Sequence, residues 1–161
     1  MTDQVAASAL RIAVATGEDL DAVMSVMQSA FEPALGESWT RAQCAGILPM
    51  SGVMMTLACD SDRPVGFTLT RSVADEAELL LIAVVPTARG RGVGSALMRN
   101  FIQSSASRGI HRLHLEVREG NPAVAVYARH GFRVHGRRAA YYKGSNGRLT
   151  DALTMGRTIE L

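Results

Sequence analysis

Cysteine, aromatic residues and net charge are all scarce in this chain of 161 residues. Its only cysteines are Cys44 and Cys59, aromatic residues make up 5% of the chain, and the formal net charge is +2. Because the cysteines lie far apart and in no metal-ligand spacing, we expect two buried free thiols. A charge of +2 is too small to indicate a nucleic-acid partner by itself, so we expect no direct contact with nucleic acid.

Long apolar runs and several functional signatures are missing as well. No apolar run approaches the roughly 18 residues that a membrane helix needs, and the stretch 1–10 contains Asp3 and no basic cluster of a secretory signal. The Gly-x-Ser-x-Gly element of serine hydrolases is absent. His111 and His114 would face opposite sides of a predicted strand, so we expect no shared metal. These features favour a soluble, cytoplasmic protein without a metal site.

Apolar residues, in contrast, make up 47% of the chain, enough for a buried core in one domain spanning residues 1–161. Hydrophobic periodicity and turn signals predict the order β-α-α-β-β-β-α-β-α-β-β, and therefore an α/β fold with one mixed sheet flanked by helices. Thr16 is the expected N-cap of the first helix. We expect strands at 10–14, 53–59, 65–72, 77–85, 113–117, 132–136 and 152–158, and helices at 20–31, 39–48, 95–107 and 122–130.

A glycine-rich turn, Arg89-Gly90-Arg91-Gly92-Val93-Gly94, joins the longest apolar strand to a predicted helix. Glycines allow positive φ and close approach of a ligand to backbone N–H groups. The helix N-terminus adds unpaired donors, and arginines add charge-assisted ones. This arrangement favours phosphate binding over an ordinary glycine-rich connection. The turn lacks both the Gly-Lys-Ser/Thr of nucleotide triphosphatases and the third glycine of the dinucleotide fingerprint, which leaves Arg-x-x-Gly-x-Gly.

A second pattern follows: Leu115-Glu116-Val117-Arg118, then Asn121, Tyr127 and Gly131-Phe132. The Arg-x-x-Gly-x-Gly turn resembles the pyrophosphate-binding motif of the GNAT acyl-coenzyme A N-acetyltransferases. The second pattern is similar to the RimI-like branch of that superfamily, which acetylates the N-terminal alanine of a small-subunit ribosomal protein. The resemblance covers most of the chain, and its further parts are Phe31 to Ala34, Trp39-Thr40, Ala77 to Val84, Tyr141-Tyr142 and Asp151 to Met155.

The resemblance implies a central mixed, mostly antiparallel sheet, acetyl-coenzyme A (acetyl-CoA) as co-substrate without a metal, and a protein or peptide N-terminus as partner, for example that of a ribosomal protein. It implies that Glu116 is the catalytic base and Tyr127 the acid. It places the cofactor on Ile82, Ala83, Val84, Arg89, Gly90, Arg91, Gly92, Val93, Gly94 and Asn121, and the substrate beside Trp39, Tyr141 and Tyr142. Asn121 precedes Tyr127 by six positions instead of the branch's usual seven, so either Asn121 or Gly120 takes the asparagine position.

Each catalytic candidate also has a structural interpretation. Leu113, Leu115 and Val117 alternate, which turns Glu116 to the opposite face, where it is either a general base or a carboxylate paired with an arginine. Tyr127 is either a buried core residue or the acid for a departing thiolate, since its unperturbed pKa near ~10 exceeds that of a thiol, near ~8.5. A basic cluster of Arg133, His135, Arg137 and Arg138 is a solvated face or a contact for an acidic ribosomal or RNA surface.

Three other functions remain open from the sequence. The same fold acetylates lysines or small-molecule amines in other GNAT proteins. A catalytically silent coenzyme A-binding module is a second alternative, against which the presence of both Glu116 and Tyr127 argues. A nucleic-acid binder that uses the basic cluster is the third, and steep salt dependence of RNA binding would be its mark.

Overall fold

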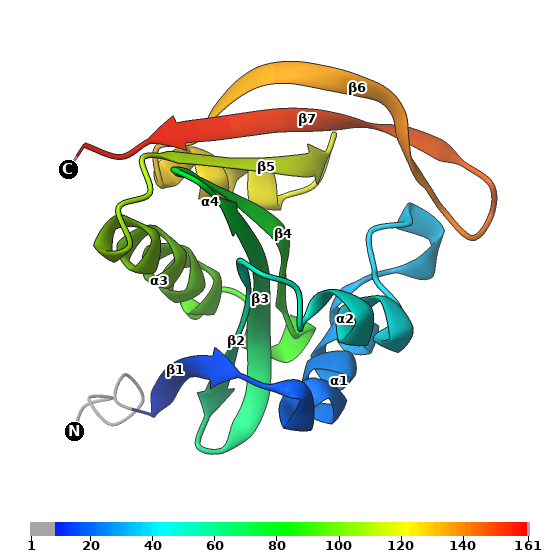
Figure 1. The fold of residues 1–161 in the computed structure, drawn as a ribbon. Helices are drawn as coiled ribbons and strands as arrows, with labels where there is room; N and C mark the ends of the chain where they lie inside the picture. The colour runs from blue at the N-terminus through cyan, green and yellow to red at the C-terminus, as the bar shows by residue number, and fades with distance from the viewer. Residues whose placement is uncertain (1–8, 161) are drawn as a thin grey trace, which may run out of the picture.

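A computed structural model describes residues 9–160 of the chain (Figure 1). The predicted order of elements is confirmed. The N-terminal residues 1–8, which belong to the stretch that carries no secretory pattern, lie outside the described residues. The elements are β1 (Leu10–Ala15), α1 (Leu20–Ala30), the 3-10 turn η3 (Pro33–Leu35), α2 (Arg41–Ile47), β2 (Val53–Asp60), β3 (Arg63–Val73), β4 (Glu76–Val84), α3 (Val93–Ser107), β5 (Arg112–Arg118), α4 (Ala123–Arg129), β6 (Arg133–Lys143) and β7 (Leu149–Thr158).

Side-chain caps precede the first two helices. Thr16, the predicted N-cap, forms a reciprocal capping box with Asp19 on the 3-10 turn η2 (Gly17–Asp19), which leads directly into α1, whereas α1 itself has no side-chain cap. At α2 the Thr40 hydroxyl accepts a hydrogen bond from the Gln43 N–H at 3.1 Å. The second helix therefore begins after Thr40, and the prediction that it starts at Trp39 is wrong because Trp39 precedes the cap.

The seven strands form one sheet in the order β1-β2-β3-β4-β5-β7-β6 (Figure 1). All neighbours are antiparallel except β4 and β5, which run parallel. Their pairing extends only from Glu76 beside Arg112 to Leu79 beside Leu115. Beyond Leu79 the two strands diverge, and one edge of β4 faces the opening between them (Figure 1).

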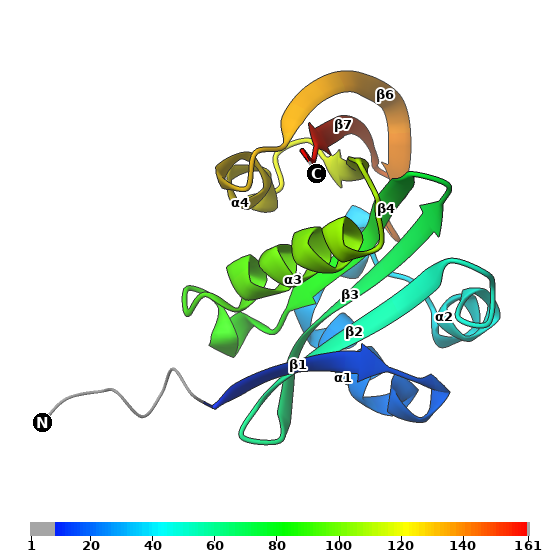
Figure 2. The same cartoon turned by 60° about the vertical axis from the view of Figure 1, so that its left-hand side comes forward.

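Helices cover both faces of the sheet. Figure 2 shows α3 on one face of β2 to β4, with α1 and α2 on the other. The largest core lies beneath α3 and α4 and includes Phe101, Leu115 and Phe132. A second core beneath α1 and α2 includes Met27 and Phe67. Two apolar cores flank the sheet at the level where β4 and β5 separate.

A β-bulge interrupts β4 at this separation. The register with β3 jumps from Leu69 opposite Leu81 to Thr70 opposite Leu79, so Leu80 is an extra residue. An extra residue reverses the alternation of side chains along a strand. Leu79 accordingly packs in the core beneath α3, whereas Leu81 packs in the core beneath α1. The sequence, apolar on both faces here, gives no sign of this reversal.

The last hairpin is longer than predicted. β6 continues past position 136 to Lys143, through a register shift between Arg138 and Tyr142. Ala140 takes a positive φ of 53° in this irregular stretch. The Asp151 carboxylate accepts a hydrogen bond from the Ala140 N–H at 2.9 Å and so supports the bend from the opposite strand.

The turn between β6 and β7 crosses η3 so closely that the main chains of the two segments are in contact. A Cβ atom on Gly144 would overlap the Ala34 carbonyl oxygen, and one on Gly36 would overlap the backbone of the turn. The Ser145 N–H donates to the Pro33 carbonyl at 3.0 Å. We call this contact the glycine crossing. It brings the connection between α1 and α2 against the last hairpin, which is far away in the sequence.

Within residues 9–160, no helix is long and apolar enough to cross a membrane. The same residues hold no group of three or more His, Cys, Asp or Glu side chains arranged to bind a metal. Both cysteines are free thiols. Cys44 is buried as predicted, but Cys59, near the end of β2, is only half-buried.

Candidate active site

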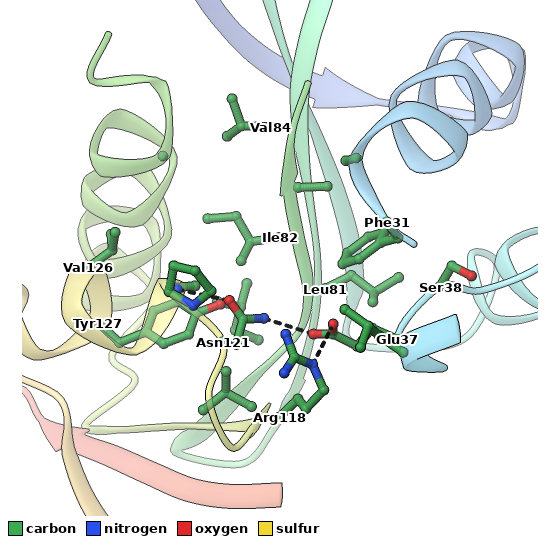
Figure 3. Close-up of a pocket in the computed structure, with 18 of the residues that line it drawn as sticks. Phe31, Glu37, Ser38, Leu81, Ile82, Val84, Arg118, Asn121, Val126 and Tyr127 are labelled. Carbon is green, nitrogen blue, oxygen red and sulfur yellow. Dashed lines mark hydrogen bonds and ion pairs between the residues drawn. The ribbon is translucent and has the colours of Figure 1, made fainter. Parts of the chain in front are cut away.

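A cavity of about 900 Å³ opens where β4 and β5 diverge. Its walls come from the connection between α1 and α2, the exposed edge of β4, the start of α3, the helix α4 and the last hairpin. The lining includes every site residue expected from the sequence except Arg91, which is exposed in the glycine-rich turn. Site residues as far apart in the sequence as Trp39 and Tyr142 therefore line one pocket. Figure 3 shows part of this lining, including Ile82, Asn121 and Tyr127.

The glycine-rich turn presents the N-terminus of α3 to the cavity. Gly90 and Gly92 have φ values of 77° and 83°, which favour glycine over any side chain-bearing residue. Gly92 is the N-cap and has no side chain with which to cap the helix. The first-turn N–H groups of α3 therefore point toward the cavity as donors for an anion. Arg129 of α4 lines the same end of the cavity.

Arg89 connects three elements around this turn. Its Nε donates to the Val84 carbonyl at 3.1 Å, and its Nη2 donates to the Ala30 carbonyl at 2.8 Å. Ala30 is the last residue of α1, where a cation is favoured by the unpaired carbonyls. Two Arg89 donors thus hold the turn in place, and the other guanidinium donors remain for a ligand.

Tyr127 projects from α4 toward the middle of the cavity. Its side chain is almost completely buried, and its ring lies 6.4 Å from that of Phe132 between centroids. Figure 3 shows the hydroxyl directed toward Asn121 and the cavity. Burial, with smaller contributions from Tyr142 and Glu37, raises the pKa of Tyr127 far above its ordinary value. The phenol is therefore protonated throughout the neutral range.

Glu116 is held from three sides. The Thr154 hydroxyl donates to its Oε2 at 2.8 Å, and Arg138 Nε lies 3.2 Å from its Oε1. The Tyr142 hydroxyl donates to the Glu116 carbonyl at 3.2 Å. The arginine pairing that the sequence left open is present, and the same carboxylate also lines the cavity. A carboxylate fixed beside the cavity is suitably placed to accept a proton directly or through water.

The structure distinguishes Asn121 from Gly120 at the start of α4. Gly120 forms the turn, with a φ of 88°, whereas the Asn121 side chain lines the cavity. The Asn121 Oδ1 accepts a hydrogen bond from the Ala123 N–H at 2.8 Å, and its Nδ2 donates to Glu37 Oε2 at 2.8 Å. Asn121 therefore caps the helix and bonds across the cavity wall.

Sequence reasoning assigned no site role to four side chains that shape this site. Glu37 lies in no pattern, Arg138 was placed only in the basic cluster, and Thr154 only in the segment from Asp151 to Met155. Arg118 was visible in the Leu-Glu-Val-Arg pattern, but its partner was not. Its Nε lies 3.0 Å from Glu37 Oε1 (Figure 3).

The three aromatic side chains that we expect beside the substrate all line the cavity. Tyr141 and Tyr142 pack edge to face, with centroids 4.9 Å apart, and the Arg138 guanidinium lies 5.6 Å from the centre of the Tyr141 ring. Trp39 also lines the cavity and packs on the core beneath α1. These rings give the substrate end of the cavity apolar surface.

Two of the three arginines in the basic cluster on β6 pair with acids. Arg137 pairs with Glu119 and, at 3.3 Å, with Asp151, and these hydrogen bonds raise the Arg137 pKa above its ordinary value. Arg138 is engaged by Glu116. A cluster whose charges are matched in this way is a weak candidate for binding RNA.

Comparison with known proteins agrees with this geometry. The model of the acetyltransferase (GNAT) family matches residues 20–132. The [ribosomal protein bS18]-alanine N-acetyltransferase of Haemophilus influenzae is 35% identical over 60% of this chain and 66% of its own length. The Escherichia coli K12 protein of that name is 40% identical over 59% of this chain and 64% of its own length. These two matches thus span about two thirds of each relative.

Longer matches extend the likeness to the whole described structure. A putative [ribosomal protein bS18]-alanine N-acetyltransferase of Bacillus subtilis is 32% identical over 88% of this chain and 91% of its own length. The crystal structure of the Escherichia coli ribosomal-protein-S18-alanine N-acetyltransferase superposes with a TM-score of 0.84 at 30% identity, covering 94% of this chain and 95% of that one. The expected α/β fold is confirmed, and the chain belongs to the acetyltransferase (GNAT) family.

Proposed function

We propose that this chain, as a single domain, transfers the acetyl group of acetyl-CoA to the N-terminal α-amine of a protein. The observation that carries the proposal is the cavity itself. It joins an uncapped helix N-terminus at one end to a buried tyrosine and a fixed carboxylate at the other. The names of the relatives point to a ribosomal protein that begins with alanine as the substrate.

The cofactor end suits a pyrophosphate attached to a long, flexible arm. The turn from Arg89 to Gly94 would hold the phosphates through backbone N–H groups and guanidinium donors. The edge of β4 from Ile82 to Val84, left unpaired by β5, would hydrogen bond to the amides of the arm and polarise the thioester carbonyl. Acetyl-CoA supplies the activated acyl group at this position.

The reaction needs one proton removed and one proton delivered. The amine nitrogen attacks the thioester carbonyl carbon, so that a C–N bond forms and the C–S bond breaks. Glu116 would take the proton lost by the amine, directly or through water, and Tyr127 would give its proton to the departing thiolate. The high pKa of Tyr127 keeps that proton available until the thiolate forms.

The substrate amine is inferred from its acidity and from the walls of the cavity. An α-amine has an unperturbed pKa near ~7.7–8.0 and lysine one near ~10.4, so near neutral pH far more of the α-amine is already neutral. A single carboxylate such as Glu116 is sufficient for the α-amine and a harder case for lysine. Trp39, Tyr141 and Tyr142 form a wall suited to a small first residue.

Mass-spectrometric mapping of the acetyl group tests the proposal. The substrates are peptides that differ only in their first residue and carry one internal lysine, and an N-blocked peptide is the control. We expect acetylation of the α-amine of peptides that begin with alanine or another small residue. Acetyl found mainly on the lysine would overturn the substrate assignment, and acetyl-CoA binding without turnover would favour the silent module.

A further inference from the structure

The connection between α1 and α2, residues 31–40, forms one wall of the cavity. Its side chains contribute Phe31, Leu35, Glu37, Ser38 and Trp39 to the lining. The glycine crossing fixes the outer side of this wall against the last hairpin. On its inner side, Glu37 binds two residues from other parts of the chain.

Glu37 uses both carboxylate oxygens to bind a different part of the chain. Oε1 lies 3.0 Å from Arg118 Nε, and Oε2 accepts from Asn121 Nδ2 at 2.8 Å (Figure 3). The Glu37 and Arg118 side chains are only 11% and 14% exposed. Separating a buried ion pair is strongly destabilising because it leaves each charge without a partner. The pair should therefore keep Glu37 and Arg118 at a fixed distance from each other.

The two partners of Glu37 belong to the catalytic side of the cavity. Arg118 ends β5, two residues after Glu116, and Asn121 caps the helix that carries Tyr127. Every hydrogen bond made by the Glu37 carboxylate therefore joins the substrate wall to the backbone that positions the proposed base or acid. The much more exposed ion pair between Arg41 and Asp21 joins α2 to α1 and makes no such connection.

We propose that Glu37 is a positioning residue, which sets the width of the cavity between the substrate wall and the catalytic pair through Arg118 and Asn121. The inference rests on the proposed acetyl transfer. This role assigns no proton transfer to Glu37, whose two carboxylate oxygens bind Arg118 and Asn121. It holds the wall at the distance at which an amine reaches Tyr127 and Glu116 together.

The test is Glu37→Gln, assayed with an alanine-first peptide. A displacement of about 1 Å in a reacting group can cost about 10²-fold in rate. We expect kcat/KM for the peptide to fall by roughly 10-fold to 10²-fold, with a raised peptide KM, while the dissociation constant of acetyl-CoA changes less than about twofold. A purely structural role would lower the melting temperature without this selective change in peptide kinetics.

Two further variants isolate the pair. Arg118→Gln should reproduce the kinetic defect, and the double variant should cost less than the sum of the two single changes, because one interaction is lost in all three. Asp21→Asn is the matched control. It breaks the ion pair between α1 and α2, the two helices that flank residues 31–40, and should leave peptide kinetics unchanged. If Glu37→Gln does not fold, Arg118→Lys retains the charge but loses the planar geometry, and it takes its place in the assay.

The outcomes separate this inference from the function on which it rests. If the unmodified protein acetylates no peptide, the proposed function fails and the inference fails with it. If the unmodified protein is active and the Glu37 and Arg118 variants keep its peptide KM within about twofold, the positioning role alone is wrong. Equal losses in peptide and acetyl-CoA affinity would also overturn it, because they would indicate general damage to the cavity.

Discussion

The two ends of the cavity are built in different ways. The cofactor end is a continuous piece of chain, in which a strand, a glycine-rich turn and a helix follow one another from β4 to α3. The substrate end is assembled from side chains that are distant in sequence, such as Glu37 with Arg118 and Glu116 with Thr154. The first depends on backbone conformation and the second on side-chain contacts. Damage to each end should therefore affect different measurements.

The largest effect should come from Tyr127→Phe, which tests the chemistry that lies between the two ends. Phenylalanine keeps the ring against Phe132 and removes only the hydroxyl. We expect kcat to fall by roughly 10²-fold or more, with acetyl-CoA affinity nearly unchanged, as for a lost general acid. Steady-state kinetics together with the melting shift produced by acetyl-CoA measure both quantities.

The pH dependence of the unmodified enzyme sharpens this prediction. Burial raises the pKa of Tyr127, so its hydroxyl stays protonated as the pH increases. We expect no fall in kcat between pH 7 and about 10 from ionisation of this group. For the substitution described above, full activity of Tyr127→Phe would show that the hydroxyl of Tyr127 is not the acid and that the residue is structural.

A smaller effect, confined to the cofactor end, should come from Gly92→Val. Gly92 and Gly109 both have positive φ, at 83° and 77°, and each has open space where a Cβ would lie. Left-handed backbone costs a β-carbon residue roughly 1–2 kcal/mol, so both valine variants should lose similar stability. Only Gly92→Val should also weaken acetyl-CoA binding. We expect a loss of affinity of about 5-fold to 30-fold, which corresponds to the same roughly 1–2 kcal/mol in binding free energy.

Gly109→Val is the matched control for that experiment because it changes the other end of the same helix. Calorimetric titration with acetyl-CoA gives both affinities, and thermal melts give both stabilities. Equal acetyl-CoA affinity in the two variants would refute the assignment of the glycine-rich turn to the cofactor.

The smallest effect should come from Asp151→Asn, which weakens the contacts of Asp151 with Ala140 and Arg137 in the last hairpin, beside the substrate end. The hydrogen bond from the Ala140 N–H, and then that from Arg137, lowers the pKa of Asp151 below its ordinary value. A lowered pKa contributes stability above the unfolded pKa, near ~3.9, and this contribution is lost as the pH falls through the folded value. We expect a slightly lower melting temperature than that of the unmodified protein at pH 7.

The melts are then repeated at progressively lower pH. The difference between the two proteins should shrink toward zero as Asp151 becomes protonated in both the folded and the unfolded state. Acetyl-CoA affinity should be unchanged throughout, since Asp151 lies on the last hairpin. A stability difference that does not depend on pH would show that the charge of Asp151 is not its cause.

The contrast between the two ends also explains what the sequence could predict. The order of elements and the glycine-rich turn follow from local signals, namely periodicity, caps and glycine spacing. The same holds for Thr16 as a cap and for the face to which Glu116 turns. The roles of Glu116, Tyr127 and the cofactor residues stay predictions, although all except Arg91 line one cavity.

The features that the sequence could not predict are those made by tertiary contacts. The extra residue Leu80 is hidden because apolar side chains on either face of a doubly covered strand look alike. The bend near Ala140 depends on Asp151 from the neighbouring strand, so β6 was expected to be shorter than it is. Glu37 has no local pattern, because its partners lie 81 and 84 positions away in the sequence.

The glycine crossing has a consequence for how this site can change in evolution. It joins two segments through main-chain atoms alone, so its geometry does not depend on the identity of the surrounding side chains. Substitutions at Leu35, Ser38 or Tyr141 can therefore accumulate and alter which chain ends are accepted, while the two segments stay in register. Any side chain at Gly144 would drive them apart at once. New substrate preferences should thus arise by exchange of the lining residues, while positions 36 and 144 stay glycine.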